Sequence, residues 1–469
     1  MMRRLSLALL FLLAACATRP RAPHDLPRGE VWVAHLENDL APFWTMPDAL
    51  GDPIGNFPTF RCNDGRRWDP ARPCDDLLEA GSWISENLDR DYVRMQSRQT
   101  YFYGVAYHLT GDPKMLALAK AGAQWIRANV DRVNGGAVSF RKHGVADAPP
   151  GARTTQDLAY AQLGLAMTYY LTRDPALLDD ILFLKQHIFR AYDDGSGLLL
   201  WVREGDDAKR RELVAQLDQV NAYMLLLAPI LPEPHRREWL RDLERLADGM
   251  VERYWSPELN LFRGTIHDPL HSGIGTRHTD FGHTSKALWM IERIGRLTHR
   301  DDLVSFATTH ARPVLAQAWD ARNGCWATGH REDGTLDRML VWWSFAELDQ
   351  LSATLALRDP SFAERLPAST RCWFDKLVDH QQHEVWGFVD PDDPSKHFAK
   401  AHLWKNGYHS AEHALVSYLT AQELHARPST LWFAFDATRA TARPYLFDGR
   451  FVRAEKSDRG TKVTFTRLR

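Results

Sequence analysis

Apolar positions along most of the chain recur with the spacing of amphipathic helices, and short polar segments interrupt them at regular intervals. Each interruption separates a helix rich in apolar and aromatic residues from a more charged one, as between residues 160–171 and 176–192. Aspartate and proline at the interruptions favour the start of the second helix. A repeat of roughly sixty residues holding two helices predicts stacked helical hairpins. The interruptions are TGDP at 110–113, TRDP at 172–175, LPEP at 231–234, THRDD at 298–302 and LRDP at 357–360.

The hairpin count predicts a closed ring. About eleven or twelve helices follow from the apolar period, with a first stretch from Asp75 to Leu109 and a last helix from about His409. Twelve would close an all-α (α/α)6 barrel, which we place at residues 31–427, with the more apolar helix of each pair inside. The segments between hairpins alternate apolar with polar residues, which predicts short β-hairpins on one rim. After Ala426 the apolar period becomes two, which predicts a small β appendage at 428–469.

The N-terminus resembles a bacterial lipoprotein signal. Two arginines precede an apolar run from Leu5 to Leu13, and small residues lead to Cys16. The run is too short for a membrane-spanning helix. The resemblance implies removal of residues 1–15 and lipidation of Cys16, with residues 16–30 as a linker. An ordinary secretory signal with an incidental cysteine is the alternative.

The same resemblance predicts the location. Ala17 after the cysteine favours the outer membrane, so we expect a lipid-anchored protein of the bacterial cell envelope on the periplasmic face of that membrane. No later stretch approaches eighteen uninterrupted apolar residues. Membrane contact is therefore expected only through the lipid on Cys16.

Charge and aromatic content narrow the expected partners. The 58 Lys and Arg nearly balance the 60 Asp and Glu, so no strong field attracts nucleic acid. The 17 Trp and 13 Tyr offer flat faces that suit sugar rings, although a large aromatic core explains them equally well. An oxidising periplasm permits disulfides. Cys62 and Cys74 flank a loop-like stretch and are expected to pair, whereas Cys325 and Cys372, far apart in the sequence, are interpreted as buried thiols.

Five segments carry a family likeness. They are SRQTYFYGVAYHLTGD at 97–112, TTQDLAYAQLGLA at 154–166, DFGHTSKALWMI at 280–291, VWWSFAEL at 341–348 and WKNGYHSAEHAL at 404–415. In order and spacing over about residues 30–426 they resemble the N-acylglucosamine 2-epimerase superfamily, which includes cellobiose 2-epimerases and aldose–ketose isomerases. No one segment is specific. Five in order on hairpins of the expected period support the barrel.

The resemblance implies a cofactor-independent carbohydrate epimerase or isomerase acting on a mono- or oligosaccharide. Such an enzyme removes the proton on the carbon beside the sugar carbonyl and passes through an enediolate, which needs a nearby base and a group that stabilises the oxyanion. His283 and His409 match the two histidines to which the family assigns proton transfer. Arg98 matches the arginine that the family places near the carbonyl oxygen. Trp343 would stack on a ring, and Glu347 would fix an indole, a hydroxyl or a catalytic histidine.

Three positions depart from the family pattern. Lys286 stands where the family often has a carboxylate, one turn after His283, and would lower the pKa of that histidine or bind an anionic group of the substrate. The segment 218–231, with Leu225, lacks a histidine that cellobiose epimerases carry. Glu412 replaces an arginine that is common three residues after the terminal histidine. The departures leave the sugar and the reaction open.

Each candidate has a structural alternative. His409 suits a helix cap, although Lys405 and Tyr408 beside it favour a site that binds substrate. Arg98 suits a buried ion pair, and Trp343 suits the core. Asp157 and Asp280 suit helix caps or hydrogen bonds in the pocket.

A metal site is not expected. Histidines four residues apart occur at 267–271 and 409–413, a spacing that a helix places on one face. Neither pair has the flanking glutamate of a metalloprotease helix, and the first contains a proline that favours a loop. We expect neither a metal nor another cofactor.

Two further functions stay open. An (α/α)6 glycosidase or polysaccharide lyase would use paired carboxylates from Asp157, Asp280 or Glu347, or Tyr408 with His409 as acid and base. The second further function is that of a non-catalytic lipoprotein that binds sugars. The oligomeric state does not follow from the sequence.

Overall fold

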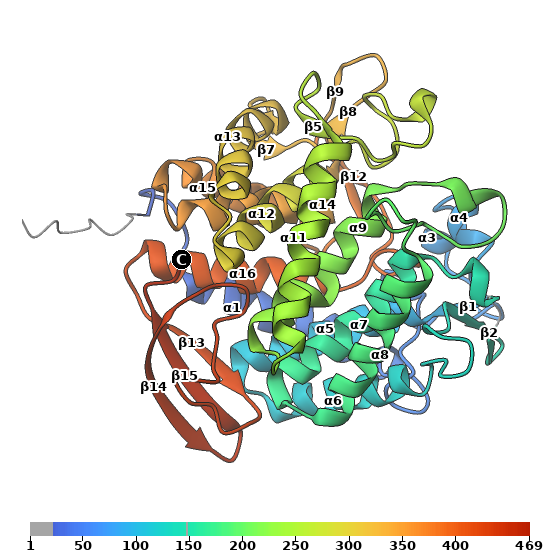
Figure 1. The fold of residues 1–469 in the computed structure, drawn as a ribbon, viewed down its shortest axis with the longest axis horizontal. Helices are drawn as coiled ribbons and strands as arrows, with labels where there is room; N and C mark the ends of the chain where they lie inside the picture. The colour runs from blue at the N-terminus through green and yellow to red at the C-terminus, as the bar shows by residue number, and fades with distance from the viewer. Residues whose placement is uncertain (1–21, 147–148) are drawn as a thin grey trace, which may run out of the picture.

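Six helical hairpins form the body of the protein in a computed structural model that describes residues 22–146 and 149–469 (Figure 1). The inner elements are α5 (Val93–Thr110), α7 (Thr155–Thr172), the run α9 (Leu213–Gln219), η5 (Val220–Met224) and α10 (Leu225–Leu227), then α12 (Phe281–Thr298), α14 (Trp342–Ala356) and α16 (Tyr408–Leu424). The outer elements are α6 (Pro113–Arg127), α8 (Pro175–Ala191), α11 (His235–Arg253), α13 (Asp301–Ala318), α15 (Leu366–Cys372) with η9 (Trp373–Leu377), and α1 (Gly29–His35). The predicted (α/α)6 barrel is confirmed.

The inner and outer helices of the barrel differ in how many of their residues are buried. Every residue of α16 is buried, whereas α11 buries only five of its 19 residues. A helix that is buried on all sides belongs inside, and a helix with one apolar stripe covers it from outside. Two of the polar interruptions seen in the sequence mark the starts of outer helices. Asp112 caps α6 and Asp174 caps α8, each by accepting a hydrogen bond from the backbone N–H two residues later in the chain.

The twelfth helix is not where the sequence placed it. Residues 75–92 hold only α3 (Asp75–Leu78), α4 (Ser82–Ser85) and β1 (Arg90–Tyr92). Instead α1, continued by η1 (Leu36–Leu40) and α2 (Ala41–Trp44), packs along α16 and closes the ring. The end of the predicted linker is part of this closure, because the Ala22 backbone donates to the Leu424 carbonyl at 3.0 Å. The barrel therefore begins before residue 31.

Short strands stand at one end of the barrel. They are β2 (Phe140–Lys142), β3 (Val145–Ala146), β4 (Trp255–Ser256), β5 (Leu261–Phe262), β6 (Trp319–Asp320), β7 (Cys325–Trp326), β8 (Gly329–His330), β9 (Leu336–Asp337), β10 (Leu340–Val341), β11 (Phe388–Asp390) and β12 (Asp393–His397). All pair antiparallel, as β1-β2-β3, β4-β5, β6-β7, β8-β9 and β10-β11-β12. One of the segments between hairpins, residues 193–205, forms only a single bridge between Asp193 and Leu199 and not the expected β-hairpin. Strands β1 and β10 lead directly into inner helices α5 and α14, so this end carries the N-termini of those helices.

Short helical turns complete the connections. These are η2 (Pro47–Ala49), η3 (Pro150–Ala152), η4 (Asp206–Lys209), η6 (Ala228–Ile230), η7 (Pro269–His271) and η8 (Pro360–Ala363). Among the described residues one helical stretch, Leu213–Ile230, is long and apolar enough to cross a membrane, but 83% of it is buried inside the barrel. It is the inner helix of the third hairpin.

The C-terminal appendage is a three-stranded antiparallel sheet. Strands β13 (Ser429–Phe433), β15 (Gly460–Thr466) and β14 (Arg450–Ser457) lie in that order, at the lower left of Figure 1, away from hairpin β8–β9. Strand β13 packs against α5, α7 and α16. The segment that joins β13 to β14 carries Tyr445, which is buried in the main core. The appendage therefore shares one core with the barrel.

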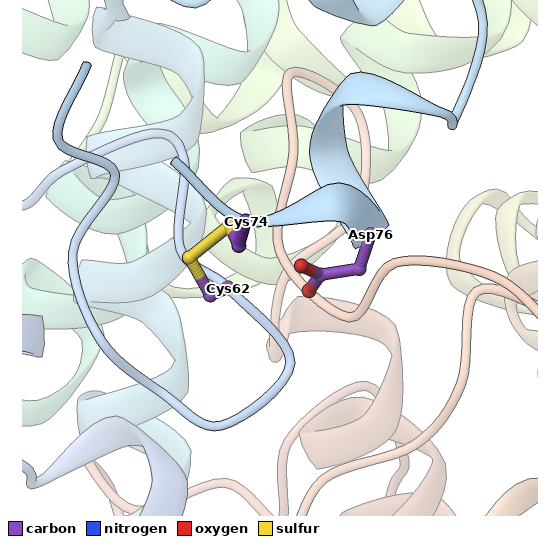
Figure 2. Close-up of side chains that lie close together, drawn as sticks. All are labelled: Cys62, Cys74 and Asp76. Atoms are coloured by element: carbon purple, nitrogen blue, oxygen red, sulfur yellow. A yellow bond between two sulfur atoms is a disulfide. The ribbon is translucent and has the colours of Figure 1, made fainter. Parts of the chain in front are cut away.

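Both cysteine pairs in the barrel are disulfides. The expected Cys62–Cys74 bond is present, and Figure 2 shows it beside Asp76, whose carboxylate accepts from the Asn63 backbone. The interpretation of Cys325 and Cys372 as buried thiols is wrong, because β7 and α15 bring them into a second disulfide. The two cysteines are 47 residues apart, a separation that hid the pairing.

Candidate active site

A pocket of about 310 Å³ opens where the N-terminal ends of inner helices meet. Its lining residues are Arg98, Gln156, Tyr160, Asp218, Arg277, His278, Asp280, His283, Lys286, Trp342, Trp343, Trp404 and His409. Of the residues that the sequence singled out for catalysis or binding, His283, His409, Arg98, Lys286 and Trp343 meet here. The volume lies at the lower end of the range for small-molecule pockets.

His283 is held by the residue that caps its own helix. Asp280 is the N-cap of α12 and accepts hydrogen bonds at 2.7 Å from both the backbone and Nδ1 of His283. Burial alone would raise the pKa of Asp280, but the His283 side chain and backbone hold it below its ordinary value. An ionised carboxylate only accepts, so Nδ1 carries hydrogen and Nε2 presents a lone pair.

His409 lies in the first turn of α16, and its side chain is 7% exposed. Its Nδ1 lies 3.5 Å from Oε1 of Glu347. Burial and then the charges of Lys286 and Arg98 hold the pKa of His409 well below its ordinary value, so the ring is neutral at pH 7. A neutral imidazole can act as a base at Nε2 when an ionised carboxylate accepts the hydrogen of Nδ1.

Trp343 lies between the two histidines. Its ring centroid is 4.5 Å from that of His283 and 6.2 Å from that of His409. Helices α12 and α16 both pack against α14, which carries Trp343. The two histidines therefore approach the pocket from two sides of one indole.

Arg98 keeps donors free for a ligand. Its Nη1 donates to the Trp404 carbonyl at 2.7 Å, and its guanidinium carbon lies 3.9 Å from the Tyr160 ring centroid. Within the described residues, its buried Nε has no hydrogen-bond partner. A permanent cation held over an aromatic face, with a donor to spare, suits an oxyanion.

Lys286 has a partner that the sequence did not reveal. Its Nζ donates to Asp218 at 2.8 Å and to the Tyr160 hydroxyl at 3.1 Å. Burial opposes the charge, but Asp218 outweighs it and raises the pKa of Lys286. Lys286 lines the pocket, as expected of a substrate contact, and its ammonium is at the same time paired with Asp218. Its charge also acts on His409.

Asp218 was missed although it stands in the segment that includes Leu225. The Asp218 carboxylate, fully buried, also accepts from Gln156 at 2.7 Å and from Tyr160 at 2.9 Å. The pocket wall at this place is thus an ionic cluster. The sequence does give one indication of this role, because an aspartate within an apolar stretch is expected to be buried and paired.

Two predicted substrate contacts are structural instead. Asp157 accepts from Arg94 at 2.6 Å and does not line the pocket. Lys405 is fully buried and donates to Glu384 at 2.8 Å. Each residue forms a largely buried ion pair with a partner from another segment of the chain.

Two further candidates lie behind the pocket wall. The Tyr408 ring is 4.2 Å from the His409 ring, and its hydroxyl accepts from Asn221 at 2.5 Å. Glu347 accepts from the Trp289 indole at 2.7 Å on one oxygen and faces His409 with the other. Neither lines the pocket, and both adjoin His409.

The histidine pairs considered for a metal do not converge. His413 binds Asp349 at 2.9 Å, away from His409, and His271 binds Asp268 beside a short 3-10 turn. One ligand atom each of Glu347, His409 and Glu412 does lie within 4.8 Å of the others. The charge of Lys286 acts on both carboxyl groups, and burial raises both of their pKa values. Such a pair retains a proton, which competes with any cation.

Known proteins match this architecture. The model of the N-acylglucosamine 2-epimerase (GlcNAc 2-epimerase) family matches residues 77–411. The chain belongs to this family. No curated protein matches the chain.

Solved structures of the same fold include the cellobiose 2-epimerase of Bacillus thermoamylovorans B4167, with 16% identity, a TM-score of 0.70, and coverage of 83% of this chain and 98% of that one. A D-mannose isomerase has 16% identity and a TM-score of 0.69, and the match covers 85% of this chain and 99% of the isomerase. The GH76A α-1,6-mannanase of Salegentibacter sp. HEL1_6 has 14% identity and a TM-score of 0.56, covering 84% and 99%. At these identities the likeness shows the fold. Membership of the N-acylglucosamine 2-epimerase family supports a carbohydrate epimerase or isomerase.

Proposed function

We propose that the pocket catalyses cofactor-independent proton transfer at the carbon next to a sugar carbonyl, with His283 and His409 as the two acid–base groups. The observation that carries this proposal is the shared construction of the two histidines. Each lies at the start of an inner helix, each adjoins Trp343, and each has a carboxyl group at Nδ1, Asp280 for one and Glu347 for the other. This arrangement presents Nε2 of each ring to a substrate.

The reaction conserves atoms and charge. One histidine takes the proton from carbon as the carbonyl π electrons move to oxygen, which gives the enediolate. Arg98 stabilises the negative oxygen with a charge-assisted hydrogen bond. The other histidine, protonated, returns a proton to the opposite face of the same carbon for epimerisation. Proton return to the neighbouring carbon, with transfer of a hydroxyl proton, gives the ketose of an isomerisation.

Incubation in heavy water tests this proposal. With a panel of aldoses, ketoses and disaccharides, we expect at least one sugar to gain a single deuterium at the carbon beside the carbonyl as its epimer or isomer forms, read by mass spectrometry and NMR. A product that forms without deuterium uptake from solvent, and with no deuterium lost from a substrate labelled at that carbon, would contradict a proton-transfer enzyme with solvent-exchanging bases.

The same panel distinguishes the glycosidase or lyase alternative. That reaction needs two free carboxyl groups or a free acid–base pair, whereas Asp157 is paired with Arg94 and Asp280 holds His283. New reducing ends or an unsaturated sugar would support hydrolysis or elimination. Binding without any turnover would support a sugar-binding protein.

We also propose that the enzyme is anchored to the bacterial cell envelope through a lipid on Cys16. The signal segment 1–15 and Cys16 lie outside the described residues, so the support is the sequence alone. Described residues 22–30 lead into α1 at the edge of the barrel. Expressed in a bacterium with labelled palmitate, the wild type should carry label and sediment with membranes. Cys16→Ser should lose both properties, and an unlabelled, membrane-free wild type would contradict the proposal.

A further inference from the structure

A buried layer of hydroxyl and carboxyl groups lies behind His409, and one of its members comes from the C-terminal appendage. The Tyr445 hydroxyl donates to Oε1 of Glu412 at 2.6 Å. It also lies 2.5 Å from the hydroxyl of Tyr101, on inner helix α5. Glu412 in turn belongs to the cluster with Glu347 and His409. A chain of contacts therefore runs from the appendage to the catalytic pocket.

The backbone around Tyr445 is held in place from both sides. Tyr170 accepts from the Tyr445 amide at 2.9 Å and donates to the Arg443 carbonyl at 2.5 Å. Tyr445 adopts a φ of +56°, which an aromatic residue rarely adopts without support from its surroundings. The side chain is 3% exposed, so the segment inserts this residue into the barrel rather than resting on it.

Glu412 places a second buried carboxyl group close to Glu347, since one oxygen of each and a ring nitrogen of His409 lie within 4.8 Å of one another. Two close carboxyl groups cannot both ionise easily, so the pair holds a proton at neutral pH. Burial raises the pKa of Glu347 to about 8, and burial also raises that of Glu412. The hydrogen bond from Tyr445 opposes the rise at Glu412.

Other charged or titratable groups face the same pair. At the two carboxyl groups these are Tyr101, Asp218, Lys286 and Tyr408. At His409 they are Lys286, Arg98, Lys405 and His283. Arg98 is held by the Trp404 carbonyl and Lys286 is paired with Asp218. The tyrosine hydroxyls stay protonated because burial raises their pKa values. Glu347 and Glu412 are the two carboxyl groups of this layer whose pKa values burial raises above their ordinary values.

We propose that Tyr445 is a positioning residue of the active site: by donating to Glu412 it keeps the shared proton on Glu347, and so decides which nitrogen of His409 carries hydrogen. Trp289 donates to Oε2 of Glu347, so a proton on Glu347 sits on Oε1 and faces Nδ1 of His409. His409 then carries hydrogen on Nε2 and cannot take a proton there. When Glu347 ionises it accepts from Nδ1, and Nε2 becomes the base. This inference rests on the proposed function of His409.

The expected pH dependence follows. In the wild type, turnover should rise with pH through about 8, as Glu347 loses its proton. Tyr445→Phe removes the strongest of the three tyrosine hydrogen bonds that favour ionised Glu412, those of Tyr445, Tyr408 and Tyr101. The shared proton should then move towards Glu412, and Glu347 should ionise at lower pH. The rise of turnover with pH should therefore occur at a pH lower by about one unit or more than in the wild type. Glu412→Gln should move it in the same direction, because a neutral neighbour no longer opposes the ionisation of Glu347.

The experiment compares kcat against pH for the wild type, Tyr445→Phe and Glu412→Gln. Tyr107→Phe is the matched control: its hydroxyl also ties a buried inner-helix tyrosine to the appendage, donating to the Arg459 carbonyl at 2.9 Å, but lies away from His409. In the control, kcat should rise over the same pH range as in the wild type. If Tyr445→Phe lowers kcat equally at every pH, the role of Tyr445 is only structural and the proposal fails.

A second measurement does not depend on turnover. In protein labelled with ¹⁵N-histidine, the ring signals of His409 are identified by their loss in His409→Asn. The wild type should show hydrogen on Nε2 below about pH 8 and on Nδ1 above it, with the change at lower pH in Tyr445→Phe. The same tautomer in both proteins at all pH values would overturn the inference. The expected tautomers without exchange on any sugar would instead reject the proposed function.

Discussion

Replacing either His409 or His283 with asparagine should lower kcat by about 10²–10⁴-fold, the range typical of lost general acid–base catalysis. KM should change little, because Arg98 and Trp343 remain to bind the sugar. The reason lies in the geometry: Nδ1 of His283 is hydrogen-bonded to Asp280, and Nδ1 of His409 lies 3.5 Å from Glu347, so Nε2 of each ring is the nitrogen expected to serve the substrate. The rates are measured by sugar product formation at several pH values.

Isotope exchange separates the two histidines further. If each serves one face of the carbon, a variant with a single histidine should still exchange the proton of one epimer with solvent without forming the other. His283→Asn and His409→Asn should then retain exchange on opposite epimers. His299→Asn is the matched control, since His299 stands exposed at the other end of α12 in a left-handed conformation that asparagine accepts well. If kcat decreases by less than tenfold in both His283→Asn and His409→Asn, the two-histidine mechanism is contradicted.

Lys405→Met should reduce the free energy of unfolding by about 3–5 kcal/mol, the usual cost of removing one partner of a buried ion pair. Both Lys405 and Glu384 are fully buried. Glu384 also accepts from Ser410 at 2.8 Å and from the Trp44 indole, so it joins the start of α16 to the N-terminal segment that closes the ring. Urea unfolding followed by circular dichroism measures the loss.

The pH dependence of this loss has a definite sign. Burial would raise the pKa of Glu384, but Lys405 and its other donors hold it below its ordinary value. A carboxyl group with a lowered folded-state pKa contributes stability above its unfolded-state pKa, and this is lost as pH falls. Without Lys405, burial raises that pKa instead, so the cost of the substitution should be largest near neutral pH and smaller in acid.

Two variants control the Lys405 experiment. The double variant Lys405→Met with Glu384→Gln should recover part of the loss, because no unpaired buried charge remains. Lys396→Met removes an exposed lysine, 3.3 Å from Asp393, and should change stability by less than about 0.5 kcal/mol. If Lys405→Met is as stable as Lys396→Met while sugar binding weakens, the original expectation of a substrate contact would stand.

The sequence by itself determined the features that local pattern encodes. The apolar period and the Asp-Pro interruptions at 112 and 174 placed outer helices at their true starts, since caps depend on a few neighbouring residues. Five ordered motifs led to the family and to a pocket that holds Arg98, His283 and His409. The Cys62–Cys74 disulfide followed from its short loop.

Only the tertiary structure decided which charges have partners. In the sequence, Lys286 and Lys405 are both charged residues near a candidate catalytic histidine. In the structure each is paired with an acid from another segment of the chain, Lys286 with Asp218 and Lys405 with Glu384. The Cys325–Cys372 disulfide, α1 as the twelfth helix and Tyr445 behind Glu412 have the same origin. Closing a ring brings together residues that no local period relates, and burial then makes their pairing obligatory, because an unpaired charge or polar group in the core is costly.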